Sequence, residues 1–171
     1  TGGQADRRTG GQADVNLMGL LKNLLKTFAD GCITFYCYDG LSNKNMKTHK
    51  DLEVWKGSMT MLTQVYQQTA GFPKSEIFGL TDQIRRAAVS VPANISEGSA
   101  RNSAKEFKYF SRVSFGSLAE LETLLIIATN LGYLSPEKFQ ALLVKIKILT
   151  VQLSNLIKAL DRKIQAQTNS Q

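Results

Sequence analysis

A proline inside a helical repeat of apolar residues constrains this chain more than any other feature. Over residues 79–107, apolar side chains recur at steps of three and four, which is the pattern of one helix face. Pro92 lies within that pattern, has no N–H to donate to the carbonyl of Ala88, and crowds that carbonyl with its ring. The pattern therefore predicts a helix kinked at Pro92, a turn at Gly98, and the start of a further helix.

The residues around the proline indicate close packing and local hydrogen bonds. Small side chains surround Pro92 and would let a neighbouring helix approach: Ala87, Ala88, Ser90 and Ala93. Asn94 and Glu97 follow, and polar side chains at a kink most often bond with the backbone groups that the kink frees. We expect this structural role for both residues.

Three further segments repeat their apolar residues at helical spacing: 48–71, 103–131 and the segment that opens at Ser135. Each has end signals, since Thr48 and Ser103 are followed three residues later by an acidic residue and Ser135 by a proline. Gly71 and Gly132 mark helix ends, and the link at 73–78 has room for one helical turn. Four helices joined by short loops predict an all-α, up-and-down four-helix bundle.

The apolar stripes are wider than one bundle seam needs. The predicted first helix carries Leu52, Trp55, Met59, Leu62, Tyr66 and Thr69; the third carries Phe110, Ser114, Ser117, Leu121, Leu124, Ala128 and Leu131, beside a second row of Phe107, Leu118 and Leu125; the fourth carries Phe139, Leu142, Ile146, Leu149, Leu153, Leu156 and Leu160, beside Leu143, Val144, Ile148, Val151 and Ile157. A monomer rarely leaves such stripes exposed, so the surplus favours self-association.

Residues 1–45 differ from the rest of the chain. The hexapeptide Thr-Gly-Gly-Gln-Ala-Asp occurs at 1–6 and again at 9–14, before a short amphipathic segment and a β-prone run at 33–38. This extension is either a docking arm or membrane-surface helix, or a leader that precedes a native start at Met46. The second interpretation is preferred, because residues 46–171 form a complete bundle domain by themselves.

Charge and cysteine content bound the function. The net charge is +7, and residues 46–171 alone carry 16 Lys+Arg against 10 Asp+Glu. This balance favours RNA or DNA as a partner, although simple solubility explains it equally well. Cys32 and Cys37 match no zinc or redox spacing, which suits a reducing cytoplasm. We find no apolar run near the roughly 20 residues that cross a bilayer, so no membrane partner is expected.

The sequence offers no constellation that would support catalysis. It has no glycine-rich phosphate loop, no nucleophile elbow and no pair of histidines at helical spacing. His49 is the only histidine, and Glu120 and Glu122 lie two residues apart and so point to different helix faces. We therefore expect no enzymatic activity, no cofactor and no metal site.

Basic residues gather on the predicted second and third helices. Arg85 and Arg86 adjoin, and four more cations are spaced four, three and four residues apart: Arg101, Lys105, Lys108 and Arg112. The last three share one stripe of the third helix, and Tyr109 flanks it. Such a stripe is able to follow a phosphate backbone, so these six residues are candidate nucleic-acid contacts, and a merely solvated face is the alternative.

Several segments resemble a known family. They are Lys50-Asp-Leu-Glu-Val-Trp55, Phe72-Pro-Lys74, Gly79-Leu-Thr81, Gln83-Ile-Arg-Arg-Ala-Ala-Val-Ser-Val-Pro-Ala-Asn-Ile-Ser-Glu-Gly98 and Gly116-Ser-Leu-Ala-Glu-Leu-Glu122. Together they resemble the four-helix bundle proteins encoded in 23S rRNA intervening sequences, and the accessory variability protein of diversity-generating retroelements is similar. The resemblance covers Met46 to about Lys163. Where the family has Ile-Ala-Glu-Gly, this chain has Ser96 in place of the alanine.

This resemblance implies a homopentameric, ring-like assembly with a basic surface and no enzymatic activity. For the retroelement branch it implies binding to a reverse transcriptase and to nucleic acid. The leading hypothesis is thus a non-enzymatic, oligomeric nucleic-acid-binding accessory protein. The alternative is a protein-interaction adaptor that holds a reverse transcriptase or another protein.

Overall fold

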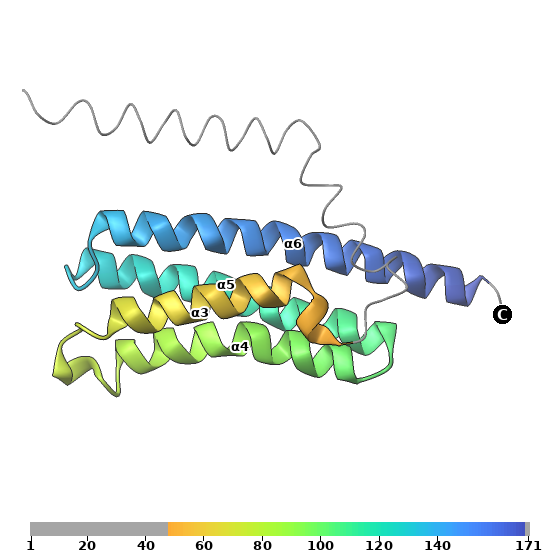
Figure 1. Ribbon diagram of the computed structural model, residues 1–171, viewed down its shortest axis with the longest axis horizontal. Helices are drawn as coiled ribbons and strands as arrows, with labels where there is room; N and C mark the ends of the chain where they lie inside the picture. The colour runs from red at the N-terminus through yellow and green to blue at the C-terminus, as the bar shows by residue number, and fades with distance from the viewer. Residues whose placement is uncertain (1–47, 170–171) are drawn as a thin grey trace, which may run out of the picture. The chain divides into compact units, whose positions relative to one another are not determined.

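Long α-helices make up nearly all of the chain that the computed structural model describes, which is residues 48–169. No strand occurs within that range, in agreement with the predicted all-α class. The predicted extension at 1–45 lies outside the described residues. The helices are the short 3₁₀ turn η1 (His49–Asp51), α3 (Glu53–Thr69), the 3₁₀ turn η2 (Lys74–Glu76), α4 (Leu80–Ala100), α5 (Ala104–Asn130) and α6 (Pro136–Thr168) (Figure 1).

Each of the four long helices packs against two of the others. α4 packs against α3 and α5, and α6 packs against α5 and α3 (Figure 1). Because only short loops connect successive helices, neighbours run antiparallel and form the predicted up-and-down bundle. α6 is the longest of the four, and its last turns extend beyond the α4–α5 turn (Figure 1).

The predicted helix ends are largely confirmed. The hydroxyl of Ser103 accepts from the N–H of Glu106 at the start of α5, and Pro136 occupies the first turn of α6 after the Ser135 cap. Gly132 has φ +74 after α5, as expected of a left-handed C-cap. Thr48 and Asp51 form both halves of a capping box, but the box closes the turn η1, so that α3 begins later than predicted.

Helix α4 runs through Pro92 without ending. The side-chain amide of Asn94 donates to the carbonyl of Ser90 at 2.8 Å, and the hydroxyl of Ser96 donates to the carbonyl of Pro92 at 2.9 Å. Asn94 therefore has the backbone role that we predicted. The same prediction was wrong for Glu97, whose carboxylate pairs with Arg101. The kink itself stays a prediction.

The predicted turn at Gly98 was also wrong. α4 continues to Ala100, and the chain reverses just after it, where Asn102 has φ 51. Asparagine tolerates this left-handed conformation better than most residues. Gly98 instead permits close packing, because a Cβ there would lie 2.8 Å from both Phe107 Cδ2 and Phe110 Cβ.

The apolar stripe predicted for the first helix was wrong for two of its six residues. Tyr66 remains 44% exposed and Met59 37% exposed. Leu52 and Thr69 of the predicted stripe are buried, and Trp55 and Leu62 pack against the core. The other buried residues of α3 were not in that stripe: Val54, Ser58, Met61 and Val65. α3 contacts both α4 and α6, and the side facing both of them differs from the most regular apolar row. Trp55 is half-buried, and its Nε1 donates to the Ser96 hydroxyl at 2.9 Å.

The second apolar row of α5 is buried within the bundle. Phe107, Leu118 and Leu125 are buried within the single chain, so they are not the surplus that we inferred. Besides Tyr109, other large apolar side chains on α5 and at its C-terminal cap are exposed, and we call these four the outer α5 surface: Phe115, Ile126, Ile127 and Leu131. An argument for self-association therefore cannot rest on the second row of α5.

Helix α6 has more apolar surface than its core contacts use. Its core row, from Leu142 to Leu160, is buried as predicted. Among the described helices, α6 alone is long and apolar enough to cross a membrane by length and composition, with an 18-residue window of mean hydropathy 1.3. The expectation that the chain has no apolar run of this length was therefore wrong. Only 28% of that window is buried in the bundle.

The close contact at Gly98 yields a stability prediction. Replacing Gly98 with alanine places a Cβ against the Cα of Phe107 as well as two side chains, and the backbone cannot move away cheaply. We expect Gly98→Ala to lower the free energy of unfolding by about 1–3 kcal/mol, measured by urea denaturation with circular dichroism.

Gly116→Ala is the matched control. Gly116 also lies within a helix, but a Cβ there meets no atom within 4 Å. Alanine should therefore stabilise α5, by up to about 1 kcal/mol through helix propensity. Equal stability of the two variants would contradict the packing role of Gly98.

Candidate nucleic-acid interface

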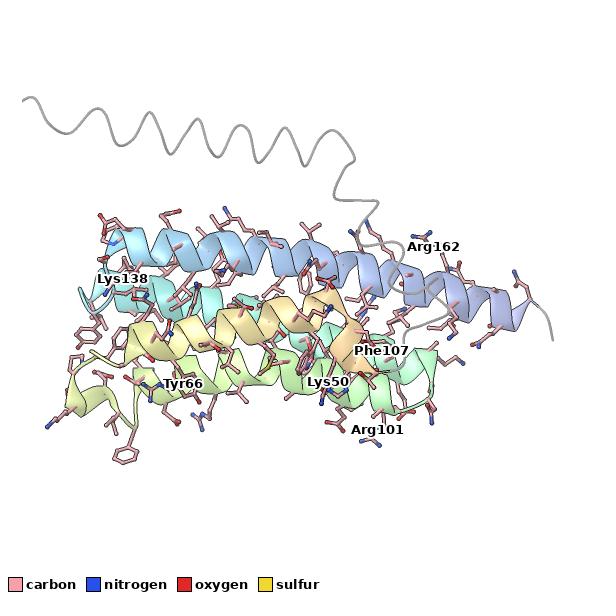
Figure 2. All side chains as sticks on the ribbon, in the orientation of Figure 1. Lys50, Tyr66, Arg101, Phe107, Lys138 and Arg162 are labelled. Carbon is pink, nitrogen blue, oxygen red and sulfur yellow. The ribbon has the colours of Figure 1, made fainter. Side chains whose placement is uncertain are left out.

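Cations gather at one end of the bundle, where α4 ends, α5 begins and α6 passes. Within residues 97–112 and 158–163 there are seven Lys and Arg side chains but only three carboxylates. Figure 2 shows Arg101, Phe107 and Arg162 at this end, whereas Lys138 and Tyr66 lie at the other. We call this region the basic end; its cations are Arg101, Lys105, Lys108, Arg112, Lys158, Arg162 and Lys163.

An ion pair joins α5 to α6 within the basic end. The half-buried Nζ of Lys108 pairs with Oδ1 of Asp161, 53 residues later in the chain. Because the helices are antiparallel, this contact sets their register and brings Lys158 of α6 level with the turn of α5 that carries Arg112. Sequence analysis missed three cations of α6, since no spacing within α6 shows which residues of α5 they approach: Lys158, Arg162 and Lys163.

Arg101 is occupied by two local contacts. Its guanidinium pairs with the Glu97 carboxylate one turn earlier and lies 5.5 Å from the centre of the Phe110 ring. The hydrogen bond and the charge of Glu97 raise the pKa of Arg101 above its usual value. The positive charge of Arg101 is thus balanced locally by Glu97.

Lys105 and Arg112 are the available cations of the predicted stripe. Both are exposed, and within the described part of the chain neither has an ion pair or a side-chain hydrogen bond. Tyr109 lies between them at helical spacing and is 64% exposed. The stripe therefore presents two free cations and one exposed aromatic ring to solvent.

The other two predicted contacts lie away from this surface. Arg85 donates from Nε to the Thr69 hydroxyl at 3.0 Å, and its guanidinium covers the Tyr66 ring at 4.8 Å. Arg86 is exposed and pairs with Asp82. Both arginines lie about 24 Å from Arg101 along the axis of α4. The structure does not bring them together with the α5 stripe.

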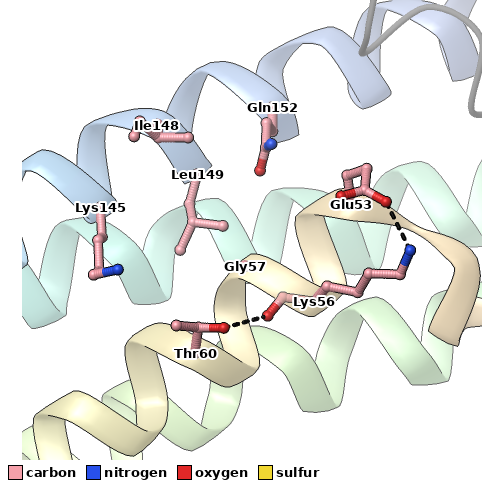
Figure 3. A pocket seen from close by; sticks show the side chains of 8 residues that line it. All are labelled: Glu53, Lys56, Gly57, Thr60, Lys145, Ile148, Leu149 and Gln152. Carbon is pink, nitrogen blue, oxygen red and sulfur yellow. Dashed lines mark hydrogen bonds and ion pairs between the residues drawn. The ribbon is translucent and has the colours of Figure 1, made fainter.

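A cavity of about 350 Å³ lies between α3 and α6 (Figure 3). The Gln152 side chain points from α6 toward Gly57, and its Oε1 is buried without a hydrogen-bond partner in the described chain. At the rim Lys56 pairs with Glu53, which raises the pKa of that lysine. Among the described residues, no group of three His, Cys, Asp or Glu residues is arranged to hold a metal.

Comparisons with known proteins agree with this helical architecture. The model of a family described as 23S rRNA-intervening sequence protein matches residues 50–155. A solved structure of a protein with unknown function from the S23 ribosomal protein family of Bacteroides thetaiotaomicron is similar, with a TM-score of 0.56 and 20% identity over 61% of this chain and 98% of that chain. At this identity, the likeness supports the fold alone. No curated protein matches this chain.

The Lys108–Asp161 pair predicts a measurable coupling between α5 and α6. A double-mutant cycle with Lys108→Ala and Asp161→Ala should give about 0.5–1 kcal/mol of coupling free energy, because both groups are half-buried. Urea denaturation of the four proteins measures it, and raising the salt concentration should reduce it.

The Glu53–Lys56 pair is the control for this cycle. It lies within α3 and is exposed, so its coupling should be only about 0.2–0.5 kcal/mol. A coupling of zero between Lys108 and Asp161 would show that their contact does not hold the two helices in register.

Proposed function

This chain belongs to the family of 23S rRNA-intervening sequence proteins, and we propose that it is a non-enzymatic, oligomeric accessory protein that binds RNA or DNA. The observation that carries the proposal is the basic end, which contains seven cationic side chains and only three carboxylates. Charge of one sign gathered on one surface attracts a polyanion. In this proposal the protein acts in the cytoplasm, needs no cofactor and does not bind a membrane. We also propose that α4 is kinked at Pro92.

The pairing of cations decides which of them contribute most to binding. Lys105 and Arg112 are free to neutralise phosphates and release counterions without first leaving a carboxylate. Lys108 and Arg101 already have acidic partners and must exchange them, so their net contribution is smaller. Arg85 holds α3 against α4 and contributes least of the six candidates.

Self-association in a ring, with five copies as the family resemblance implies, is the second part of the proposal. The outer α5 surface supplies apolar side chains that a stable monomer seldom leaves exposed. The basic end is unsuited to contact between copies, because like charges would meet. Assembly through the outer α5 surface therefore leaves the basic ends accessible and multiplies their charge.

A protein-interaction adaptor is the second candidate function. The observation that favours it is an exposed apolar tip between α3 and α4, where Phe78 is 94% exposed and Ile77 49% exposed. A partner such as a reverse transcriptase would bury these side chains. If the protein co-purifies with a reverse transcriptase and Phe78→Ala abolishes this, the adaptor is supported. If charge reversal at the basic end abolishes nucleic-acid binding, the first proposal is supported.

Charge reversal at the free cations tests nucleic-acid binding. Replacing Lys105 and Arg112 with glutamate should weaken binding to a structured RNA at least tenfold, because two phosphate contacts become repulsive. Extending the reversal to Lys108 should remove binding, while helix content stays unchanged. Filter binding at several salt concentrations measures both the affinity and its salt dependence.

Lys74→Glu with Lys138→Glu is the matched control. It changes the net charge equally, but both lysines lie at the opposite end of the bundle: Lys138 is seen there in Figure 2, and Lys74 belongs to η2, between α3 and α4 (Figure 1). The control should keep most of the affinity. If it loses as much as the double variant at Lys105 and Arg112, total charge and not the basic end governs binding. Absence of any wild-type affinity at low salt would overturn the proposal.

The outer α5 surface predicts the assembly state. Wild-type protein should sediment with a mass of about five chains of 18.9 kDa. Ile126→Asp with Ile127→Asp should yield a folded monomer, because burying two carboxylates in an apolar interface costs more free energy than the interface contributes. Sedimentation velocity measures the mass.

Met59→Asp with Val89→Asp is the corresponding control. These two side chains are equally exposed but lie on α3 and α4, so the oligomer should persist. A monomeric wild-type protein at micromolar concentration would contradict self-association. Dissociation of the control alone would place the interface on α3 and α4.

A further inference from the structure

We infer that Tyr109 is a stacking platform for an unpaired base, so that the substrate class is nucleic acid with single-stranded nucleotides. The inference rests on the proposed nucleic-acid binding and names its substrate. It is carried by the position, the exposure and the support of one aromatic ring within the basic end.

The position of Tyr109 matches what a stacking platform needs. Lys105, Tyr109 and Arg112 follow one another at steps of four and three, so they lie on one face of α5. The two free cations therefore flank the ring by about one helical turn on each side. A phosphate backbone that contacts both cations passes over the ring, and aromatic side chains between cations are how single-strand binding surfaces hold successive bases.

The ring of Tyr109 is supported at its edge but not covered. It meets the Phe110 ring at 5.3 Å between centroids and an interplanar angle of 80°. Phe110 is itself fixed by its contact with Gly98 and by the Arg101 guanidinium on its ring. The Tyr109 side chain is thus held by a rigid neighbour while most of it stays in solvent.

Other exposed aromatic rings lack one of these properties. Tyr66 is exposed, but the Arg85 guanidinium already occupies its face. Phe78 is more exposed than Tyr109, but it lies between η2 and α4, and that link is at the opposite end of the bundle from the basic end (Figure 1). Phe115 is only 38% exposed and belongs to the outer α5 surface. Tyr109 alone among these four combines exposure with two unpaired cations.

The chemistry of stacking separates single strands from duplexes. In a duplex each base is already stacked between its neighbours, so an exposed ring on a helix surface finds no free base face. In loops, bulges and ends the bases are free to turn outward and stack on tyrosine, with little dependence on sequence. RNA and DNA single strands share this chemistry, and both should bind.

Fluorescence anisotropy with two labelled probes tests the inference on the full chain. One probe is a 12-nucleotide single strand of mixed sequence, as RNA and as DNA, and the other is a blunt duplex of the same length. Tyr109→Ala should weaken binding of the single strands roughly 5- to 150-fold and change duplex binding little. Tyr109→Phe should keep wild-type affinity, because the ring and not the hydroxyl makes the contact.

Phe78→Ala is the control for loss of an exposed aromatic ring, and it should bind both probes as the wild type does. If the wild type binds but Tyr109→Ala weakens both probes equally or neither, the stacking role is overturned while the proposed binding stands. A wild-type preference for the duplex also overturns it. If the wild type binds neither probe, both the inference and the proposed function fail.

Discussion

The close approach of α4 and α5 is the contact on which the rest of the structure depends. Gly98 lets Phe107 and Phe110 pack directly against the backbone of α4. Farther along, the hydroxyl of Ser114 donates to the carbonyl of Val91 at 3.0 Å, so a buried polar group also joins the two helices. Helices that meet this closely cannot rotate against each other, because any rotation forces a side chain into a backbone.

That contact also determines the basic end. The Phe110 ring that packs beside Gly98 supports Tyr109 on one side and Arg101 on another. The same orientation of α5 brings Lys108 to Asp161 of α6. The packing of α5 against α4 therefore determines which surface cations form contacts within the bundle and which remain available to a ligand.

The candidate site was predictable in part. The spacing of Lys105, Lys108 and Arg112 places them on one stripe whatever the tertiary structure, because helical periodicity alone determines that arrangement. Their pairing was not predictable, since the partner of Lys108 lies 53 residues away. Arg85 shows the same limit: its basic character suggested a phosphate contact, but its neighbours Thr69 and Tyr66 come from another helix.

The sequence by itself determined the helices, their order, most of their ends and the wide apolar content, because capping, proline and glycine effects act within a few residues. Only the tertiary structure decided which side of each helix is buried. Val65 lies in the core while its neighbour Tyr66, from the more regular apolar row, is exposed, and Gly98 permits close packing instead of forming a turn. The physical reason is that burial depends on two neighbouring helices at once, whereas periodicity describes only one.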